Sequence, residues 1–150
     1  MSNPLKLMAL DTEDLLVLSA HVQDGVLKSG EIEYQSATGN LIIPLNRFAW
    51  ELPSAQRLFF KKFERRRSIL HVSKVRSIRS TALDRDDEDE VQSLLSLDFV
   101  GGEGPQDPSG NIELNFGGEA KIIAAVECIE VRLTDMGAAW AASSKPQHHV

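Results

Sequence analysis

The stretch NIELNFGGEAKIIAAVECIEVRLTDMGAAW, residues 111–140, decides the fold that we expect for this chain. Apolar and polar side chains alternate on either side of Gly117-Gly118, and this pattern predicts a β-hairpin closed by a two-residue turn. The period then changes from two to the helical spacing of three and four residues. The sequence therefore predicts a C-terminal amphipathic helix after the hairpin. Its apolar stripe comprises Val126, Ile129, Leu133, Met136 and Trp140.

A second helix is expected near the N-terminus, over residues 11–23. Asp11 is a good N-cap, and the two acidic residues that follow it favour the positive end of the helix dipole. Leu15, Leu18 and Val22 then recur at helical spacing, which predicts one buried face.

The residues between these helices predict strands. Alternation indicates strands at 31–35, 41–50 and 91–102, after a short first strand at 5–10. Pro44 cannot donate a ladder hydrogen bond, so the 41–50 strand is expected at a sheet edge or at a bulge. The apolar phase slips between residues 72 and 75, which predicts a bulge or a bend within one long strand.

These elements predict an α+β domain over residues 1–142, with a flexible polar tail at 143–150. We expect a mostly antiparallel bent sheet or roll of about six to seven strands, with an N-terminal helix and the C-terminal amphipathic helix. This arrangement is similar to pleckstrin-homology-like rolls, in which a helix plugs a bent sheet.

Composition predicts a soluble cytoplasmic protein. The chain has 150 residues, 42% hydrophobic and 25% charged, with a formal net charge of −6. It has no apolar run near the roughly 20 residues needed to cross a bilayer. Its one cysteine excludes an internal disulfide and a multi-cysteine zinc site. The first residues, MSNPLKLMALDTED, lack the features of a secretory signal or a transit peptide.

Several blocks of the sequence together resemble a known family. LMALDTEDLLVLSAHVQDGVLKSGEIEY, NRFAWE, RRRSILHVSKVRSI and VECIEVRLTDMGAAW occur in this order. They are similar to an uncharacterised bacterial family, domain of unknown function 2948, over about residues 5–140. The resemblance implies a cytoplasmic bacterial protein and supplies no catalytic residues.

Positive charge is concentrated in residues 57–79, which carry nine Lys and Arg and one Glu, a sum of +8. The acidic run DRDDEDE, residues 84–90, follows closely and would neutralise a neighbouring basic strand. The basic stretch is therefore interpreted in three ways: a solvated strand face, a docking face for an acidic protein, or a nucleic-acid surface. A sequence pI of about 5.2 argues against nucleic acid.

No motif in the sequence indicates catalysis, a cofactor or a metal site, so we expect no catalytic, cofactor-binding or metal-binding residues. We favour a small non-catalytic protein-interaction or regulatory module that binds an unknown protein or a second copy. A nucleic-acid-contacting accessory protein that uses residues 57–79 is the alternative, and an enzyme of unrecognised type is a further one. No membrane partner is expected. The candidate partner-binding residues are Trp50, Arg65, Arg66, Arg67, Lys74 and Arg76.

Overall fold

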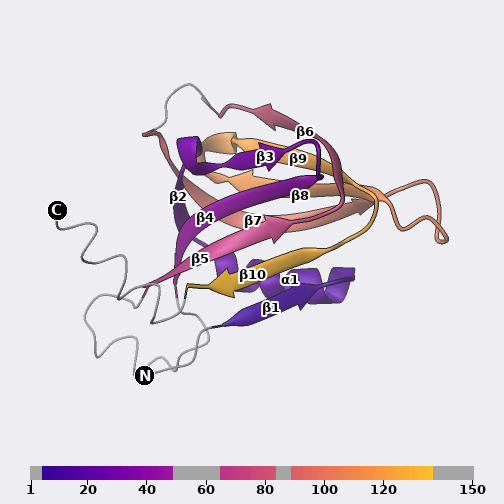
Figure 1. Ribbon diagram of the computed structural model, residues 1–150, viewed down its shortest axis with the longest axis horizontal. Helices are drawn as coiled ribbons and strands as arrows, with labels where there is room; N and C mark the ends of the chain where they lie inside the picture. The colour runs from indigo at the N-terminus through magenta and orange to yellow at the C-terminus, as the bar shows by residue number, and fades with distance from the viewer. Residues whose placement is uncertain (1–4, 49–64, 84–88, 137–150) are drawn as a thin grey trace.

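The computed structural model describes residues 5–48, 65–83 and 89–136. In these three segments the chain forms ten strands, one α-helix and two short 3-10 helices (Figure 1). The strand pairings between them are antiparallel, in the order β1-β10-β5-β4-β2-β7-β8-β9-β6, with β3 paired to β4. In chain order the elements are β1 (Lys6–Ala9), α1 (Thr12–Val22), β2 (Gly25–Lys28), η1 (Ser29–Glu31), β3 (Glu33–Gln35), β4 (Asn40–Phe48), β5 (Arg65–Val72), β6 (Val75–Thr81), β7 (Val91–Gly101), β8 (Gly110–Phe116), η2 (Gly117–Glu119), β9 (Lys121–Val126) and β10 (Val131–Asp135).

The sheet bends at a corner where two strand pairs, β5–β6 and β9–β10, are both interrupted. β5 and β6 are interrupted at Ser73 and Lys74, where Lys74 takes a left-handed φ of 60°. β9 and β10 are interrupted at the facing position. Backbone hydrogen bonds continue through the corner, from the Ser73 N–H to the Glu130 carbonyl at 2.9 Å and from the Glu127 N–H to the Lys74 carbonyl at 3.0 Å. The predicted irregularity between residues 72 and 75 is present, but it separates two strands and does not bend one long strand.

Helix α1 covers a flank of β7 that the neighbouring strand leaves open. β2 pairs with β7 only as far as Leu94. Beyond that point the Leu97 N–H donates to the Ser19 hydroxyl of α1 at 2.9 Å, and the helix also contacts β1 and β4. In Figure 1, α1 runs beside β1 on the lower side of the sheet. One side of this helix is therefore packed against the sheet along its length.

The core side chains lie on the inner face of the bent sheet, because every second residue of a strand points to that face. Leu41, Ile43 and Leu45 of β4 are fully buried, and Val72 and Leu70 of β5 are the cross-strand partners of the first two. Leu15, Leu18 and Val22 of α1 belong to the same cluster. Each such aliphatic side chain contributes about 1.5–3 kcal/mol when fully buried.

Two predicted elements are confirmed. Asp11 caps α1, where its carboxylate accepts from the Asp14 N–H at 2.8 Å. Strands β8 and β9 form the predicted hairpin, and Gly118 between them has a φ of 68°, which glycine adopts without strain. The predicted two-residue turn is wrong, because the connection runs through η2 and the Phe116 N–H donates to the Ala120 carbonyl at 2.9 Å.

The predicted C-terminal amphipathic helix is wrong. Residues 131–135 form β10, in which Val131, Leu133 and Asp135 are buried at a period of two. The apolar residues of this segment fit both the helical period and the strand period of two. The strand forms because β10 completes ladders with β1 and β5. The β-branched Val131 and Thr134 also favour an extended backbone. The last residues of the predicted stripe, 137–140, lie outside the described residues.

The α+β class with six to seven strands is wrong as well. The described residues form a mostly antiparallel sheet of ten strands with one α-helix. Prediction missed β2 and β10 and counted β5 and β6 as one strand. The likeness to pleckstrin-homology-like rolls depended on the C-terminal helix, and it is withdrawn together with that helix.

The expected edge position of the 41–50 strand is also wrong, because β4 has β5 on one flank and β3 and β2 on the other. The β3 ladder ends at Ile42 and β2 pairs only at Asn46. Pro44 lies in the gap between these two ladders. On this side of β4 no hydrogen bond therefore requires a backbone N–H at residue 44, which proline lacks.

Candidate functional site

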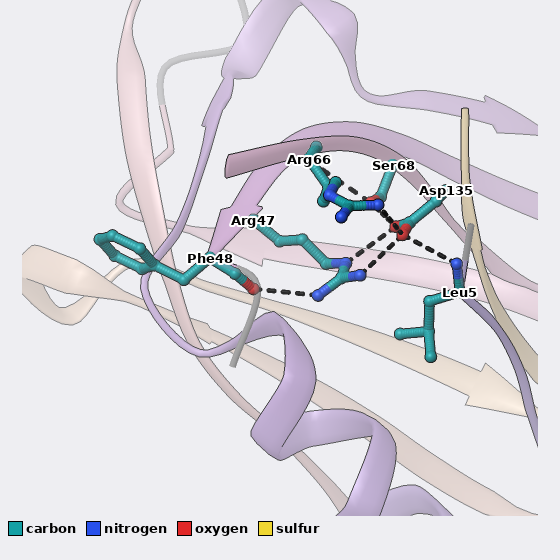
Figure 2. A network of polar contacts seen from close by, with 6 residues as sticks. All are labelled: Leu5, Arg47, Phe48, Arg66, Ser68 and Asp135. Carbon is teal, nitrogen blue, oxygen red and sulfur yellow. Dashed lines mark hydrogen bonds and ion pairs between the residues drawn. The ribbon is translucent and has the colours of Figure 1, made fainter. Parts of the chain in front are cut away.

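A charged pair is buried where β4, β5 and β10 meet the start of β1 (Figure 2). Arg47 donates from Nε to Asp135 Oδ1 at 2.9 Å and from Nη2 to Oδ2 at 2.7 Å, and neither side chain has exposed surface. Ser68 donates to Oδ1 at 2.5 Å, and the Leu5 N–H donates to Oδ2 at 2.9 Å. Arg47 Nη1 donates to the Phe48 carbonyl at 2.9 Å. The carboxylate thus accepts four hydrogen bonds, two of them from the guanidinium.

Strand alternation places these groups together. Arg47 occupies the next inward position after Leu45, and Asp135 the next inward position after Leu133. Ser68 of β5 is the register partner of both Leu45 and Asp135. Sequence analysis did not single out Arg47 or Asp135. The signal that would have found them is a charged residue that continues the period-two pattern of a buried strand.

The network keeps the Asp135 carboxylate ionised. Burial raises the pKa of Asp135, but hydrogen bonds from Arg47, Ser68 and the Leu5 N–H, together with the charge of Arg47, lower it further. The net result is a pKa below the ordinary value of 3.8. An ionised carboxylate has no proton to donate, and here both of its oxygens are enclosed and already accept hydrogen bonds, so neither can reach the proton of a substrate. The pair therefore fixes the ends of four strands and does not act as an acid or a base.

A second polar cluster lies around His71 on the outer side of β5. His71 Nε2 is 2.8 Å from Asn40 Oδ1 and 3.4 Å from Ser73 Oγ. Burial, and then the charge of Arg132, lower the pKa of His71 below 6.5, against a smaller raising effect of Glu130. The imidazole is therefore neutral at pH 7, and the contact with the amide oxygen assigns its proton to Nε2.

This cluster is not arranged for nucleophilic catalysis. A base that activates a hydroxyl uses one ring nitrogen for the nucleophile and the other for an orienting group. Here Ser73 and Asn40 both approach Nε2 of His71. Within the described segments, no group of three or more His, Cys, Asp or Glu side chains is placed to hold a metal ion.

The hollows on the surface of the described part of the chain include the following two. The first, of about 470 Å³, lies at the base of the loop between β7 and β8, where Arg76, Ser109 and Asn111 contribute polar groups. The Asp107 carboxylate, which accepts bonds from the Ser109 hydroxyl and N–H, closes that loop on itself. The second hollow, of about 170 Å³, lies between α1 and β7. Its lining is mainly apolar and comprises Thr12, Leu15, Leu16, Leu97, Asp98 and Phe99.

The second hollow borders an exposed apolar surface on α1. Glu13, Leu16, Val17 and Ala20 lie on one side of the helix at helical spacing, and we refer to them as the α1 outer face. All four are exposed, and Leu16 and Val17 keep 66% and 53% of their surface. Leu10, just before the helix, is 59% exposed. The open side of α1 thus carries Leu16, Val17 and Ala20 next to the acidic Glu13.

A comparison with protein-family models identifies the family. The model described as a protein of unknown function, DUF2948, matches residues 5–148, nearly the whole chain. The chain belongs to the DUF2948 family. The family resemblance noted from the sequence is confirmed. No curated protein and no solved structure matches this DUF2948 chain.

The predicted partner-binding residues of this DUF2948 chain are divided between the start of β5 and the corner that follows its end. Arg66 lies 4.0 Å from Asp135, and Arg67 forms a 3.1 Å ion pair with Glu31. Lys74 is at the corner beyond the other end of β5, an eight-residue strand that spans about 25 Å. Arg76 borders the polar hollow farther along β6. Arg65 begins β5, its side chain lies outside the described part of the chain, and so does Trp50.

Two further expectations concern the basic stretch 57–79: that the acidic run 84–90 neutralises it, and that it binds nucleic acid. The described end of the acidic run contacts β2 and η1, since Asp89 is 3.9 Å from Lys28 and Glu90 accepts from the Ser29 hydroxyl at 2.8 Å. Residues 84–88 of that run lie outside the described segments. Binding of nucleic acid by the basic stretch stays a prediction. No helix in the described segments has the length and apolarity to cross a membrane.

Proposed function

We propose that the protein is an interaction module that binds another polypeptide through the α1 outer face. The observation that carries the proposal is the exposure of Leu16 and Val17, at 66% and 53%, on a helix whose other side is packed. A surface helix normally presents polar residues to water, and Leu16 and Val17 depart from that pattern in the middle of α1. The α1 outer face is therefore suited to being covered by a second surface.

The α1 outer face is also held rigidly. Asp11 caps the first turn, and the bond from the Leu97 N–H to Ser19 fixes the middle of the helix on β7. A surface that is already ordered loses little conformational entropy on binding. Burial of the exposed parts of Leu16 and Val17 would contribute about 2–4 kcal/mol in total.

The charges beside the α1 outer face limit the kind of partner. Asp11, Glu13 and Asp14 surround its N-terminal end, and His21 is the one basic residue in the last turn. Such a surface repels nucleic acid and acidic proteins and favours an apolar stripe with a neutral or basic end. The proposal thus places binding on α1 and away from the basic stretch of β5 and β6.

The test is the size of the complex that the chain forms at its natural level in clarified extract of its source cells. Size-exclusion chromatography should show wild type eluting above monomer size and Leu16→Asp eluting as a monomer. Val91→Asp is the matched control, because Val91 is an equally exposed aliphatic residue, at 60%, on β7. Wild type that elutes as a monomer, or a Leu16→Asp profile equal to wild type, would refute the proposal. Circular dichroism of each purified variant shows that it is folded.

A further inference from the structure

We infer that the open flank of β6 accepts an extended acidic segment of another polypeptide as an added strand. We refer to this flank, which comprises residues 76–81 on the side of β6 away from β9, as the β6 edge. It is separate from the α1 outer face and takes a different class of partner, so the inference goes beyond the proposed function. In strand addition, main-chain hydrogen bonds hold an extended peptide at a sheet edge, and alternate side chains give specificity.

The β6 edge offers backbone groups that have no partner strand. In the described sheet, β6 is paired with β9 on one flank and with no strand on the other, and Figure 1 shows it at the upper margin of the sheet. The turn between β3 and β4 closes the start of the open flank, where the Val75 N–H donates to the Gly39 carbonyl at 2.9 Å. Alternate residues of an antiparallel strand direct their N–H and C=O groups to opposite flanks. Residues 76–81 span about 20 Å, which is enough to pair with an added strand of about six residues.

Exposed cations without partners lie along the β6 edge. Lys74, at the corner before β6, and Arg76 and Arg79 within it form no ion pair or side-chain hydrogen bond in the part of the chain that the structure describes. The acidic run that follows β6 does not supply a partner at its described end, which contacts β2 and η1. Glu113, two strands away on β8, is already paired with Lys121. The β6 edge is therefore locally positive.

Charge selects an acidic strand as the occupant. Opposite charges on adjacent strands stabilise the pair, and like charges destabilise it. Two copies of the β6 edge side by side would bring their arginines together, so a second copy does not fit. At physiological salt, charges act over about 8 Å. The cations of the β6 edge therefore act on an added strand more strongly than the distant charges that make the net charge −6.

The side chains along β6 define the added strand further. Ile78 packs against the core, so its neighbours Ser77 and Arg79 point to the opposite face of the sheet. An added strand alternates in the same way. Apolar residues on the face of Ile78 would extend the core, and Asp or Glu on the face of Arg79 would pair with its guanidinium. The occupant is thus an extended segment in which apolar and acidic residues alternate.

The probe is a short fluorescent peptide with blocked ends in which Glu alternates with Val. Fluorescence anisotropy with the purified full chain measures its affinity, and NMR of the isotope-labelled chain locates the contact. Changes in the amide signals should be concentrated at residues 76–81. Hydrogen exchange at these residues should slow, because the added strand bonds the outward N–H groups of the β6 edge.

Variants test the contribution of the cations. Arg79→Glu should weaken binding of the peptide by about tenfold or more, because it places a like charge beside the added strand. Lys6→Glu is the matched control, since it makes the same change of charge at an exposed lysine of β1, and it should leave the affinity unchanged. Leu16→Asp should also bind as wild type does, which separates the β6 edge from the α1 outer face. Circular dichroism should be the same for all variants, because each substituted residue is exposed.

Two further ligands separate strand addition from the attraction of charge alone. The same peptide with N-methyl groups on consecutive central residues keeps its charge but cannot pair along either edge, so it should not bind. An oligothymidylate of the same net charge tests a nucleic-acid surface, and it should bind more weakly than the peptide.

Four results would overturn the inference: no change in the β6 amide signals at millimolar peptide, equal binding of the N-methylated peptide, an unchanged affinity in Arg79→Glu, or tighter binding of the oligothymidylate. The last result would assign the β6 edge to nucleic acid. None of them bears on the α1 outer face. A short added strand held by exposed charges is weakly bound and dissociates during chromatography, so the extract experiment reports on the α1 outer face alone.

Discussion

Substitution of Asp135 by Asn should be among the most destabilising single changes available in this fold. The Asp135 carboxylate balances the charge of a guanidinium that has no exposed surface, and it accepts four hydrogen bonds. An amide in its place carries no charge and has one oxygen acceptor. Its NH₂ group would face donors on Arg47 or the Leu5 N–H and leave them without an acceptor.

The size of the effect follows from burial. Removal of one partner of a buried ion pair costs about 3–5 kcal/mol because the other charge remains uncompensated. Domains have total stabilities of about 5–15 kcal/mol, so Asp135→Asn should lose a large share of the folding free energy. We expect a fall of the melting temperature by roughly 10 °C. Urea unfolding followed by circular dichroism measures the free energy directly.

Two variants test the reasoning. Glu113→Gln removes one charge from the partly exposed pair of Lys121 and Glu113, and it should cost less than about 1 kcal/mol. Arg47→Met combined with Asp135→Asn should recover part of the loss, because no unpaired guanidinium stays buried. A loss below about 1 kcal/mol in Asp135→Asn alone would show that the buried pair does not hold the strands.

The same carboxylate predicts acid sensitivity. Because the folded-state pKa of Asp135 is lowered, its contribution to stability is present above the unfolded pKa, about 3.9, and is lost as pH falls through the folded value. The free energy of unfolding of wild type should therefore fall below about pH 4, and the fall should be smaller in Asp135→Asn.

Other predictions concern a histidine and a glycine. By NMR titration the pKa of His71 should lie below 6.5 and should rise in Arg132→Gln. Because the folded-state pKa is lowered, the contribution of this histidine to stability is present above about pH 6.5 and is lost as pH falls through the folded value. A pKa above 6.5 would contradict the burial and charge effects. Gly110→Ala should destabilise by about 1–3 kcal/mol in urea unfolding, since its Cβ would collide with the backbone carbonyl oxygen of Val100 and lie 2.7 Å from the ring of Phe99, whereas Gly104→Ala should be neutral because nothing lies within 4 Å. Equal stabilities of the two alanine variants would show that the backbone at Gly110 moves freely.

The sequence predicted the elements whose signals are local. Asp11 and the spacing of Leu15 and Leu18 identified α1, and Gly118 lay in the turn of the predicted hairpin. The C-terminal segment failed because its apolar residues fit both periods. Only the ladders that β10 makes with β1 and β5 decide between them, and those partners lie more than 50 residues away in the chain.

The exposure of the α1 outer face was outside the reach of sequence patterns. The inward side of α1 was predicted, but the exposure of Leu16 and Val17 depends on the sheet covering only one side of the helix. The basic stretch attracted attention because nine cations lie close in sequence. A β-strand spreads such residues over both faces and along its length, so Arg67 and Lys74 lie at different ends of β5.

The most direct test of the account is photo-cross-linking in living source cells with a benzophenone amino acid that replaces Val17, beside the same replacement at Val91. The account predicts a cross-linked protein adduct from position 17 that is missing from position 91. No adduct at position 17, or equal adducts from both positions, would contradict the claim that the protein acts by binding a polypeptide through the α1 outer face.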